Sequence, residues 1–171
     1  MKLLVLCVLV FSEMAWAGAD PVPDDGSADE DPMDLVQRSA SCPSGWSEYN
    51  GNCYHYVSMP LDWASAERHC MSMGGHLASV HNLREYHQIQ HVIRTASYRS
   101  EHTWIGGTDA QKKNVWFWSD GSRFHYTNWC PREPNNWGGN QYCLLINHTV
   151  GKCWADQTCL AHLPSVCAKK A

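Results

Sequence analysis

The chain has 171 residues, with 13 Lys and Arg against 17 Asp and Glu, and its formal net charge at pH 7 is −4. That balance does not indicate nucleic-acid binding, which requires a clustered basic face. Nine cysteines and nine tryptophans are many for this length. They indicate a domain that relies on disulfides and large buried rings.

The N-terminus has the three parts of a secretory signal peptide. Lys2 precedes the apolar run 3–11, and the small residues of Ala15-Trp16-Ala17 follow. We therefore expect a signal peptide at 1–17, cleavage after Ala17 and a secreted, extracellular protein. The apolar run is too short to cross a bilayer, and no later stretch is long and apolar enough, so no membrane span is expected.

Residues 18–40 differ in composition from the rest of the chain. They contain seven acidic residues against one base (Arg38), with three prolines and no aromatic residue. Such a segment cannot bury enough apolar surface to offset the entropy lost on ordering. It is interpreted as an acidic disordered leader or a propeptide, and the composition does not decide whether it is removed.

Residues 41–171 have the size of one domain. Without Lys2, Arg38 and the eight acidic residues before Ser41, 11 basic and nine acidic residues remain. Loss of Cys7 with the signal peptide leaves an even number of cysteines, which indicates a disulfide framework. Zinc is the alternative, but it favours pairs spaced C-x2-4-C, and no such pair occurs. About 105 pairings are open to the eight cysteines, which are 42, 53, 70, 130, 143, 153, 159 and 167.

The predicted elements begin with a hairpin over 46–57, turning at Gly51-Asn52. A helix is expected over 62–73, because apolar residues recur there at intervals of three or four, and Gly74-Gly75 would end it. After a strand at 76–80, Asn82 would cap a second helix, with Glu85 at the capping-box position. The buried stripe of this second helix would be Tyr86, Ile89, Val92 and Ile93.

The second half of the domain reads as short strands around one long loop. A Pro-, Gly- and Asn-rich segment from about 127 to 141 forms the loop. The expected strands are 104–107, 115–119, 142–146, 152–155 and 163–168. Two helices with mostly short strands predict the α+β class.

Ordered motifs along residues 42–168 resemble the C-type lectin-like domain family. They are CPSGW, GNCYHY, WASAERHC, GGHLASVH, WIGG, VWFWSDG, EPNN and the closing CWADQTC and SVCAKK. Secreted fish lectins and type II fish antifreeze proteins are the most similar members. The resemblance implies two helices, two small antiparallel sheets and a long loop, stapled by disulfides. It also implies the pairs Cys42–Cys53, Cys70–Cys167 and Cys143–Cys159, and an antifreeze-like extra pair Cys130–Cys153.

The resemblance also places a calcium and sugar site on the long loop. Glu133 and Asn135 match the first two calcium ligands, and Asp156 matches the fifth; their Glu-Pro-Asn order resembles the mannose-type loop. Gln141 stands where a glutamate is expected and Ala155 where an asparagine is expected. Because ligand charge and number set calcium affinity, the site is expected to be weak or lost. A ligand-competent loop should have a cis Glu133–Pro134 bond.

Other positions near the loop leave alternatives open. Lys113, Asn136 and Tyr142 replace residues expected at the family's accessory calcium position. Trp137 could stack on a sugar or anchor the loop. Asn147 begins an N-glycosylation sequon on a predicted turn.

Two functions therefore remain from the sequence. The first is a carbohydrate-binding lectin, which the resemblance associates with innate defence; its partner would be a mannose-type glycan. The second is an ice-binding protein that acts without calcium. An enzyme is not expected, because the sequence has no G-x-S-x-G motif and the disulfide framework leaves no free cysteine as a nucleophile.

Overall fold

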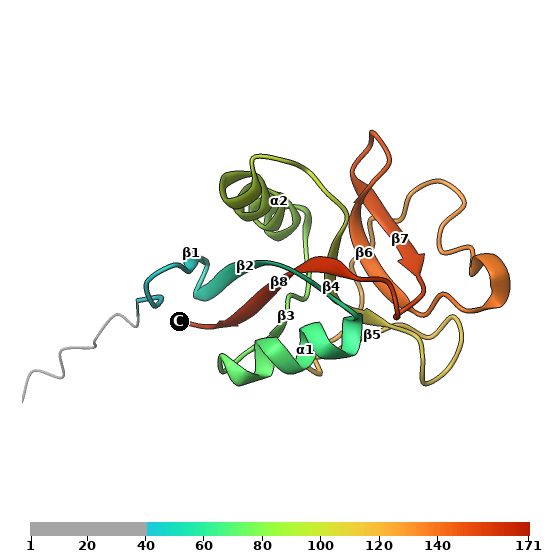
Figure 1. The fold of residues 1–171 in the computed structure, drawn as a ribbon, viewed down its shortest axis with the longest axis horizontal. Coiled ribbons are helices and arrows are strands. Elements are labelled where there is room, and N and C mark those ends of the chain that lie inside the picture. The colour runs from blue at the N-terminus through green and yellow to red at the C-terminus, as the bar shows by residue number, and fades with distance from the viewer. Residues whose placement is uncertain (1–40) are drawn as a thin grey trace, which may run out of the picture. The chain divides into compact units, whose positions relative to one another are not determined.

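The computed structural model describes residues 41–171. The predicted signal peptide and acidic leader lie outside the described residues. Two helices, one short 3-10 helix and eight strands make up the described part (Figure 1). They are β1 (Ser47–Tyr49), β2 (Asn52–Leu61), α1 (Trp63–Ser72), β3 (His76–Leu77), α2 (Leu83–Ser97), β4 (Thr103–Thr108), β5 (Phe117–Trp118), η1 (Trp137–Gly139), β6 (Cys143–His148), β7 (Cys153–Gln157) and β8 (Leu163–Lys170).

The strands form one hydrogen-bonded sheet in the order β1-β2-β8-β4-β6-β7, with β3 on β8 and β5 on β4. Every pairing between these strands is antiparallel except that of β4 with β8, which is parallel and meets at Trp104 and Ser165. The expectation of two separate antiparallel sheets is thus corrected. This single parallel pairing joins the terminal strands to the strands that carry the long loop, while the α+β class is confirmed.

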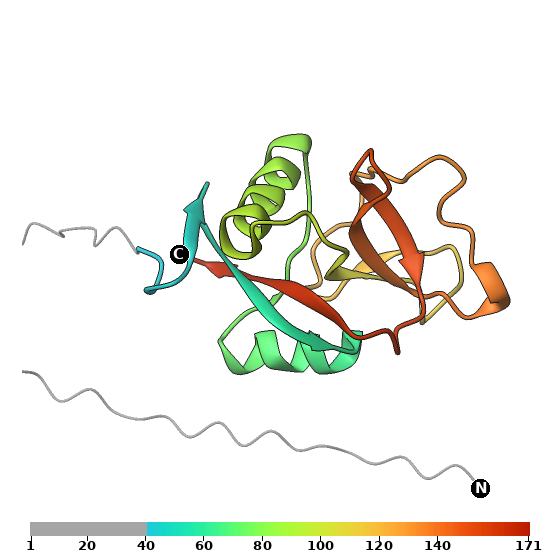
Figure 2. The same cartoon turned by 45° about the horizontal axis from the view of Figure 1, so that its top comes forward.

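The two helices begin where their capping residues predict. The Asp62 side chain accepts a hydrogen bond from Ser65 N at 2.9 Å and starts α1. Asn82 caps α2 by accepting from Glu85 N at 2.9 Å, and the Glu85 carboxylate reaches back to His81 N at 2.8 Å. Figures 1 and 2 place α1 and α2 on opposite sides of the β2–β8 pair. Neither helix in residues 41–171 is long and apolar enough to cross a membrane.

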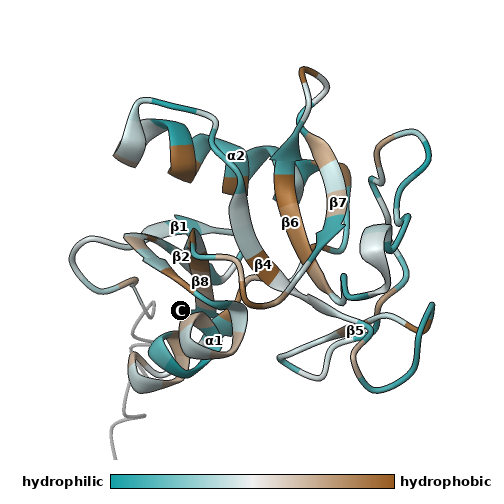
Figure 3. Ribbon diagram, turned by 45° about the vertical axis from the view of Figure 1, so that its right-hand side comes forward, coloured by the Kyte–Doolittle hydropathy of each residue, from teal (hydrophilic) through white to brown (hydrophobic). Residues whose placement is uncertain are grey.

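Buried apolar residues come from β4, β6 and α2 among other elements, and Figure 3 shows hydrophobic colour along most of β6, on part of β4 and in bands on α2. Trp104 and Trp154 are both fully buried. Trp104 also donates its indole N–H to Leu61 O at 3.0 Å. The predicted stripe of α2 (Tyr86, Ile89, Val92 and Ile93) is buried in the same core as Trp154.

Four disulfides cross-link the domain, in the pairs that the resemblance implies: Cys42–Cys53, Cys70–Cys167, Cys130–Cys153 and Cys143–Cys159. The pair with the largest sequence separation, 97 residues, ties α1 to the last strand. Four disulfides fit an oxidising compartment.

Two predicted strands are shorter than expected. The strand predicted at 115–119 consists only of Phe117–Trp118, and Val115 is exposed. The strand predicted at 76–80 ends at Leu77, although Ala78 N still donates to Val166 O at 2.8 Å. Apolar composition alone was the basis of both predictions, and it does not reveal how far a partner strand extends.

Candidate functional site

The beginning of the long loop is fixed against β7. Cys130 N donates to Trp154 O at 2.9 Å, and Trp154 N donates to Asn128 O at 2.8 Å. The Cys130–Cys153 disulfide fastens the same two segments. Because Trp154 is fully buried, the loop starts from a rigid support and passes over the next residues of β7.

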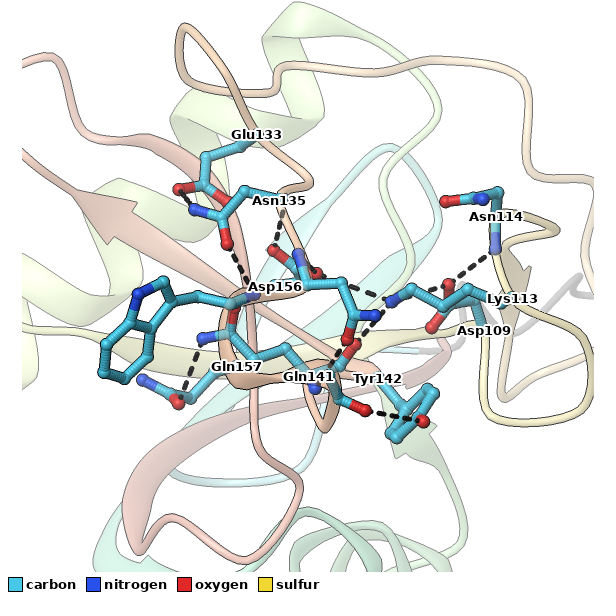
Figure 4. A network of polar contacts seen from close by, with 12 residues as sticks. Asp109, Lys113, Asn114, Glu133, Asn135, Gln141, Tyr142, Asp156 and Gln157 are labelled. Atoms are coloured by element: carbon cyan, nitrogen blue, oxygen red, sulfur yellow. Dashed lines mark hydrogen bonds and ion pairs between the residues drawn. The ribbon is translucent and has the colours of Figure 1, made fainter.

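Asp156 on β7 is the centre of the loop's hydrogen bonds (Figure 4). Its carboxylate accepts from Asn135 N at 2.9 Å and from Asn136 N at 2.8 Å, and its side chain is fully buried. Its neighbour Ala155 is also buried and has no side-chain oxygen to add. The structure thus brings together Asp156 and Asn135, two of the calcium ligands that the sequence predicts, and their role as ligands stays a prediction.

Glu133 lies beside Asp156 with part of its charge uncompensated. One carboxylate oxygen accepts from Asn135 Nδ2 at 2.7 Å, while the other, Oε2, is buried without a hydrogen-bond partner. Burial, together with the nearby negative charge of Asp156, raises the pKa of Glu133 to about 7. The bond from Glu133 to Pro134 is cis.

The Gln141 side chain, at the end of the long loop, contacts both the loop and β7. The N–H of Trp137 is shared between Asn135 Oδ1 at 2.7 Å and Gln141 Oε1 at 2.6 Å. Gln141 Nε2 faces Gln157 Oε1 at 3.4 Å, which fixes the direction of the amide. The Trp137 side chain is 79% exposed, so its ring is not a buried anchor of the loop.

The four predicted ligands therefore lie in one hydrogen-bonded cluster that contains two carboxylates. The buried, unpartnered Glu133 Oε2 next to Asp156 is an arrangement that a hard cation would relieve. Within residues 41–171, however, no group of three or more His, Cys, Asp or Glu could hold a metal ion. The amide oxygens of Asn135 and Gln141 already accept hydrogen bonds from Trp137 N. The cluster therefore offers two carboxylates, Glu133 and Asp156, and two amide oxygens that already accept hydrogen bonds.

Sequence reasoning missed the role of Lys113, which it noted only as the loss of an acidic residue. The Lys113 ammonium donates to the Gln141 backbone oxygen at 2.6 Å and lies 3.2 Å from Asp109 Oδ2 and 3.6 Å from Asp156 Oδ2. The spacing of Asp109 and Lys113, four residues apart, was the one local signal available. The contacts with residues 141 and 156 depend on the fold.

The predicted glycosylation position does not fit the folded domain. Asn147 belongs to β6 instead of the predicted turn, and it is only 4% exposed. Its amide nitrogen, where a glycan would be attached, donates to Glu101 O at 3.1 Å. Its oxygen accepts from Gln90 Nε2 at 3.3 Å. A glycan at this nitrogen would require these contacts to open.

Comparison with known proteins agrees with this fold and loop. The family model described as "Lectin C-type domain" matches residues 59–169, and the chain belongs to that family. Ladderlectin of Oncorhynchus mykiss is 43% identical over 76% of this chain and 68% of its own length. The galactose-specific lectin nattectin of Thalassophryne nattereri is 40% identical over 78% of this chain and 83% of its own.

Antifreeze proteins are similar to this chain as well. The structure of the herring type II antifreeze protein matches with a TM-score of 0.71 and 36% identity, over 76% of this chain and 99% of its own. Both a calcium-dependent and a calcium-independent type II antifreeze protein occur among the similar solved structures, with TM-scores of 0.70 and 0.69. Family membership therefore leaves both ligand and calcium use open for this chain.

Proposed function

We propose that this chain is a secreted lectin that binds mannose-type glycans through a weak calcium ion on the long loop. Glu133, Asn135, Gln141 and Asp156 would hold the ion. The observation that carries the proposal is the buried oxygen Glu133 Oε2, which has no partner and lies beside a second carboxylate. Burying the negative charge of Glu133 beside a second carboxylate is unfavourable, and calcium binding would lower that cost.

Calcium would supply positive charge and vacant coordination positions for sugar hydroxyls. The protein would supply the hydrogen bonds: the Glu133 carboxylate accepts, and the Asn135 amide nitrogen donates. These two groups bond to each other at 2.7 Å, so both lie within reach of the same ligand. The acceptor-then-donor order along Glu-Pro-Asn supports a mannose type, although nattectin is a galactose-specific relative.

Trp137 extends the proposed glycan site beyond the ion. Its ring is 79% exposed, while its backbone N–H is fixed by Asn135 and Gln141. A ring held in this way offers a flat apolar face on which a sugar can pack at small entropic cost. Trp137 is the only exposed tryptophan among the eight in the described domain, which supports a binding role for it.

Ice binding without calcium is the second candidate. The observation that favours it is the loop's internal order: backbone N–H groups of the loop donate to the side-chain oxygens of Asp156, Asn135 and Gln141. The Cys130–Cys153 disulfide adds a covalent restraint on the same loop. A loop that is rigid without calcium would offer ice a fixed surface, and the herring type II antifreeze protein is among the similar structures.

A mannan column separates the two functions. The protein should be retained in millimolar calcium and eluted by chelator or free mannose, and less readily by galactose. The double variant Gln141→Glu with Ala155→Asn adds a charge and an oxygen, so it should require at least about tenfold less calcium for retention. Failure of both proteins to bind, together with shaped ice crystals in chelator, would replace the lectin proposal with the antifreeze one.

A further inference from the structure

The base of the long loop contains a second group of oxygens that surround the Lys113 ammonium (Figure 4). The oxygens come from three separate places: Asp109, which follows β4, the Gln141 backbone before β6, and Asp156 on β7. Their distances to Nζ are 3.2, 2.6 and 3.6 Å. Nζ also lies 4.9 Å from the centroid of the Tyr142 ring. An ammonium has three N–H donors, which matches three acceptors on one side.

Both carboxylates beside Lys113 are fully buried, and the Lys113 side chain is only 29% exposed. Two buried negative charges are costly unless a cation or hydrogen bonds compensate them. Within residues 41–171, Lys113 makes the only Lys or Arg salt bridges, and these are with Asp109 and Asp156. Backbone N–H groups also donate to these carboxylates, from Asn114 to Asp109 Oδ2 at 2.8 Å and from Asn135 and Asn136 to Asp156, but among the described residues Lys113 supplies the only positive charge of a Lys or Arg side chain in salt-bridge contact with them.

We propose that the Lys113 ammonium takes the place of a bound metal ion at the loop base. We call this its tethered-cation role: the side chain supplies the positive charge, so the loop folds without calcium. It bridges three segments, as a bound divalent ion would, and it cannot be removed by a chelator. It also partly neutralises Asp156, a ligand of the proposed calcium site, and so weakens that site. The tethered-cation role does not depend on sugar binding.

The same geometry predicts what replaces the ammonium when its charge is removed. Asp109 Oδ1 is buried and has no hydrogen-bond partner even in the native chain. Without the Lys113 ammonium, this oxygen, Asp109 Oδ2, Asp156 Oδ2 and the Gln141 carbonyl would lose their shared positive charge, and the two carboxylates would keep only their backbone hydrogen bonds from Asn114, Asn135 and Asn136. Oxygen groups of this kind are calcium ligands. A glutamate at position 113 would add a third carboxylate, and it would make the loop base require an ion.

The test is thermal unfolding of the oxidised full-length protein and its variants, in chelator and in millimolar calcium. Lys113→Met keeps the side-chain volume and removes the charge, so it should lower the melting temperature in chelator by about 5 °C. Lys113→Glu should melt lower still in chelator and should recover most of the loss in calcium. Lys112→Glu is the control, because it makes the same charge change at the adjacent exposed position.

The Glu133→Gln background separates this idea from the proposed lectin site. Calcium should still stabilise Lys113→Glu in that background, because the loop-base oxygens do not include Glu133, whereas the native calcium response should disappear. A Lys113→Met protein that melts like the native protein in chelator would overturn the proposal. So would a Lys113→Glu protein that gains no more from calcium than Lys112→Glu. If Lys113→Glu does not fold, the Lys113→Met result alone decides.

Discussion

The body of the domain and its long loop are stabilised by different kinds of interaction. The body rests on apolar packing around buried rings such as Trp104 and on the Cys70–Cys167 disulfide, neither of which responds to ions or to pH near neutrality. The loop rests on hydrogen bonds and charges around Asp156. The difference teaches that the stability of the loop depends on charge, whereas that of the body depends mainly on buried apolar area and a disulfide.

The two regions meet at β7. Trp154 on this strand packs in the core, and Asp156, two residues later, accepts hydrogen bonds from the loop. A strand that is rigid at one residue holds its neighbours in place, so the loop's charged groups are positioned by the apolar core. Changes in the core should therefore cost the most global stability, and changes in the loop should cost less global stability but alter the response to calcium and pH. The following variants test that asymmetry.

The largest effect should come from Trp104→Ala. Trp104 is fully buried, and removing its ring loses about 3–5 kcal/mol of unfolding free energy through lost burial and a residual cavity. Urea unfolding measures the change. Trp104→Phe is the control: it keeps most of the apolar volume but leaves Leu61 O without its indole donor, so it should cost clearly less. Equal losses for the two variants would contradict the packing account.

Removing the Cys130–Cys153 disulfide should have the next largest effect. The cysteines are 23 residues apart, and the chain-entropy estimate for opening such a loop is about 3 kcal/mol. The double alanine variant should also lose any calcium-dependent rise in melting temperature, because the loop is no longer held on β7. The matched variant without Cys42–Cys53, separated by 11 residues, should lose slightly less stability and keep its calcium response.

Acid should stabilise the calcium-free loop through Glu133. Its pKa is raised to about 7 by burial and by Asp156, so the native protein binds a proton that the unfolded chain releases. This contribution is fully present below the ordinary glutamate pKa and is lost as the pH rises through about 7. In chelator, the melting temperature of the native protein relative to Glu133→Gln should therefore rise by a few degrees from about pH 8 to about pH 5. A constant difference would show that Glu133 titrates normally.

Trp137→Ala should have the smallest effect on stability. The ring is 79% exposed, so its loss should change the unfolding free energy by less than about 0.5 kcal/mol. Mannan retention should nevertheless weaken if the ring packs on the sugar. Leu160→Ala removes another exposed apolar side chain, 78% exposed, and should leave retention unchanged. Weakened retention in both variants would indicate a nonspecific apolar contribution.

Features that depend on neighbours in the chain could be predicted from the sequence. Asn82 and Glu85 are three residues apart, and their capping pattern gave the correct start of α2. The Glu-Pro-Asn triplet and Asp156 were identified as one site because the order of motifs matches a known family, and the structure brings them together.

Features that depend on register between distant segments could not be predicted. Lys113 contacts Gln141 and Asp156, and nothing local to position 113 states how β4, β6 and β7 align. The polar sequence around Asn147 predicts a turn at this position. In the structure β6 continues through His148, and the Asn147 amide is buried and donates to Glu101 O. Both outcomes follow from strand pairing across the sheet.

The most direct test of the proposed calcium lectin is the melting temperature of the native protein with and without calcium. A ligand that binds only the native state raises the melting temperature by mass action. Millimolar calcium should raise it by a few degrees in the native protein and leave Glu133→Gln and Asp156→Ala unchanged. An unmoved melting temperature in the native protein, with ice crystals shaped by it in the presence of chelator, would contradict the calcium lectin account.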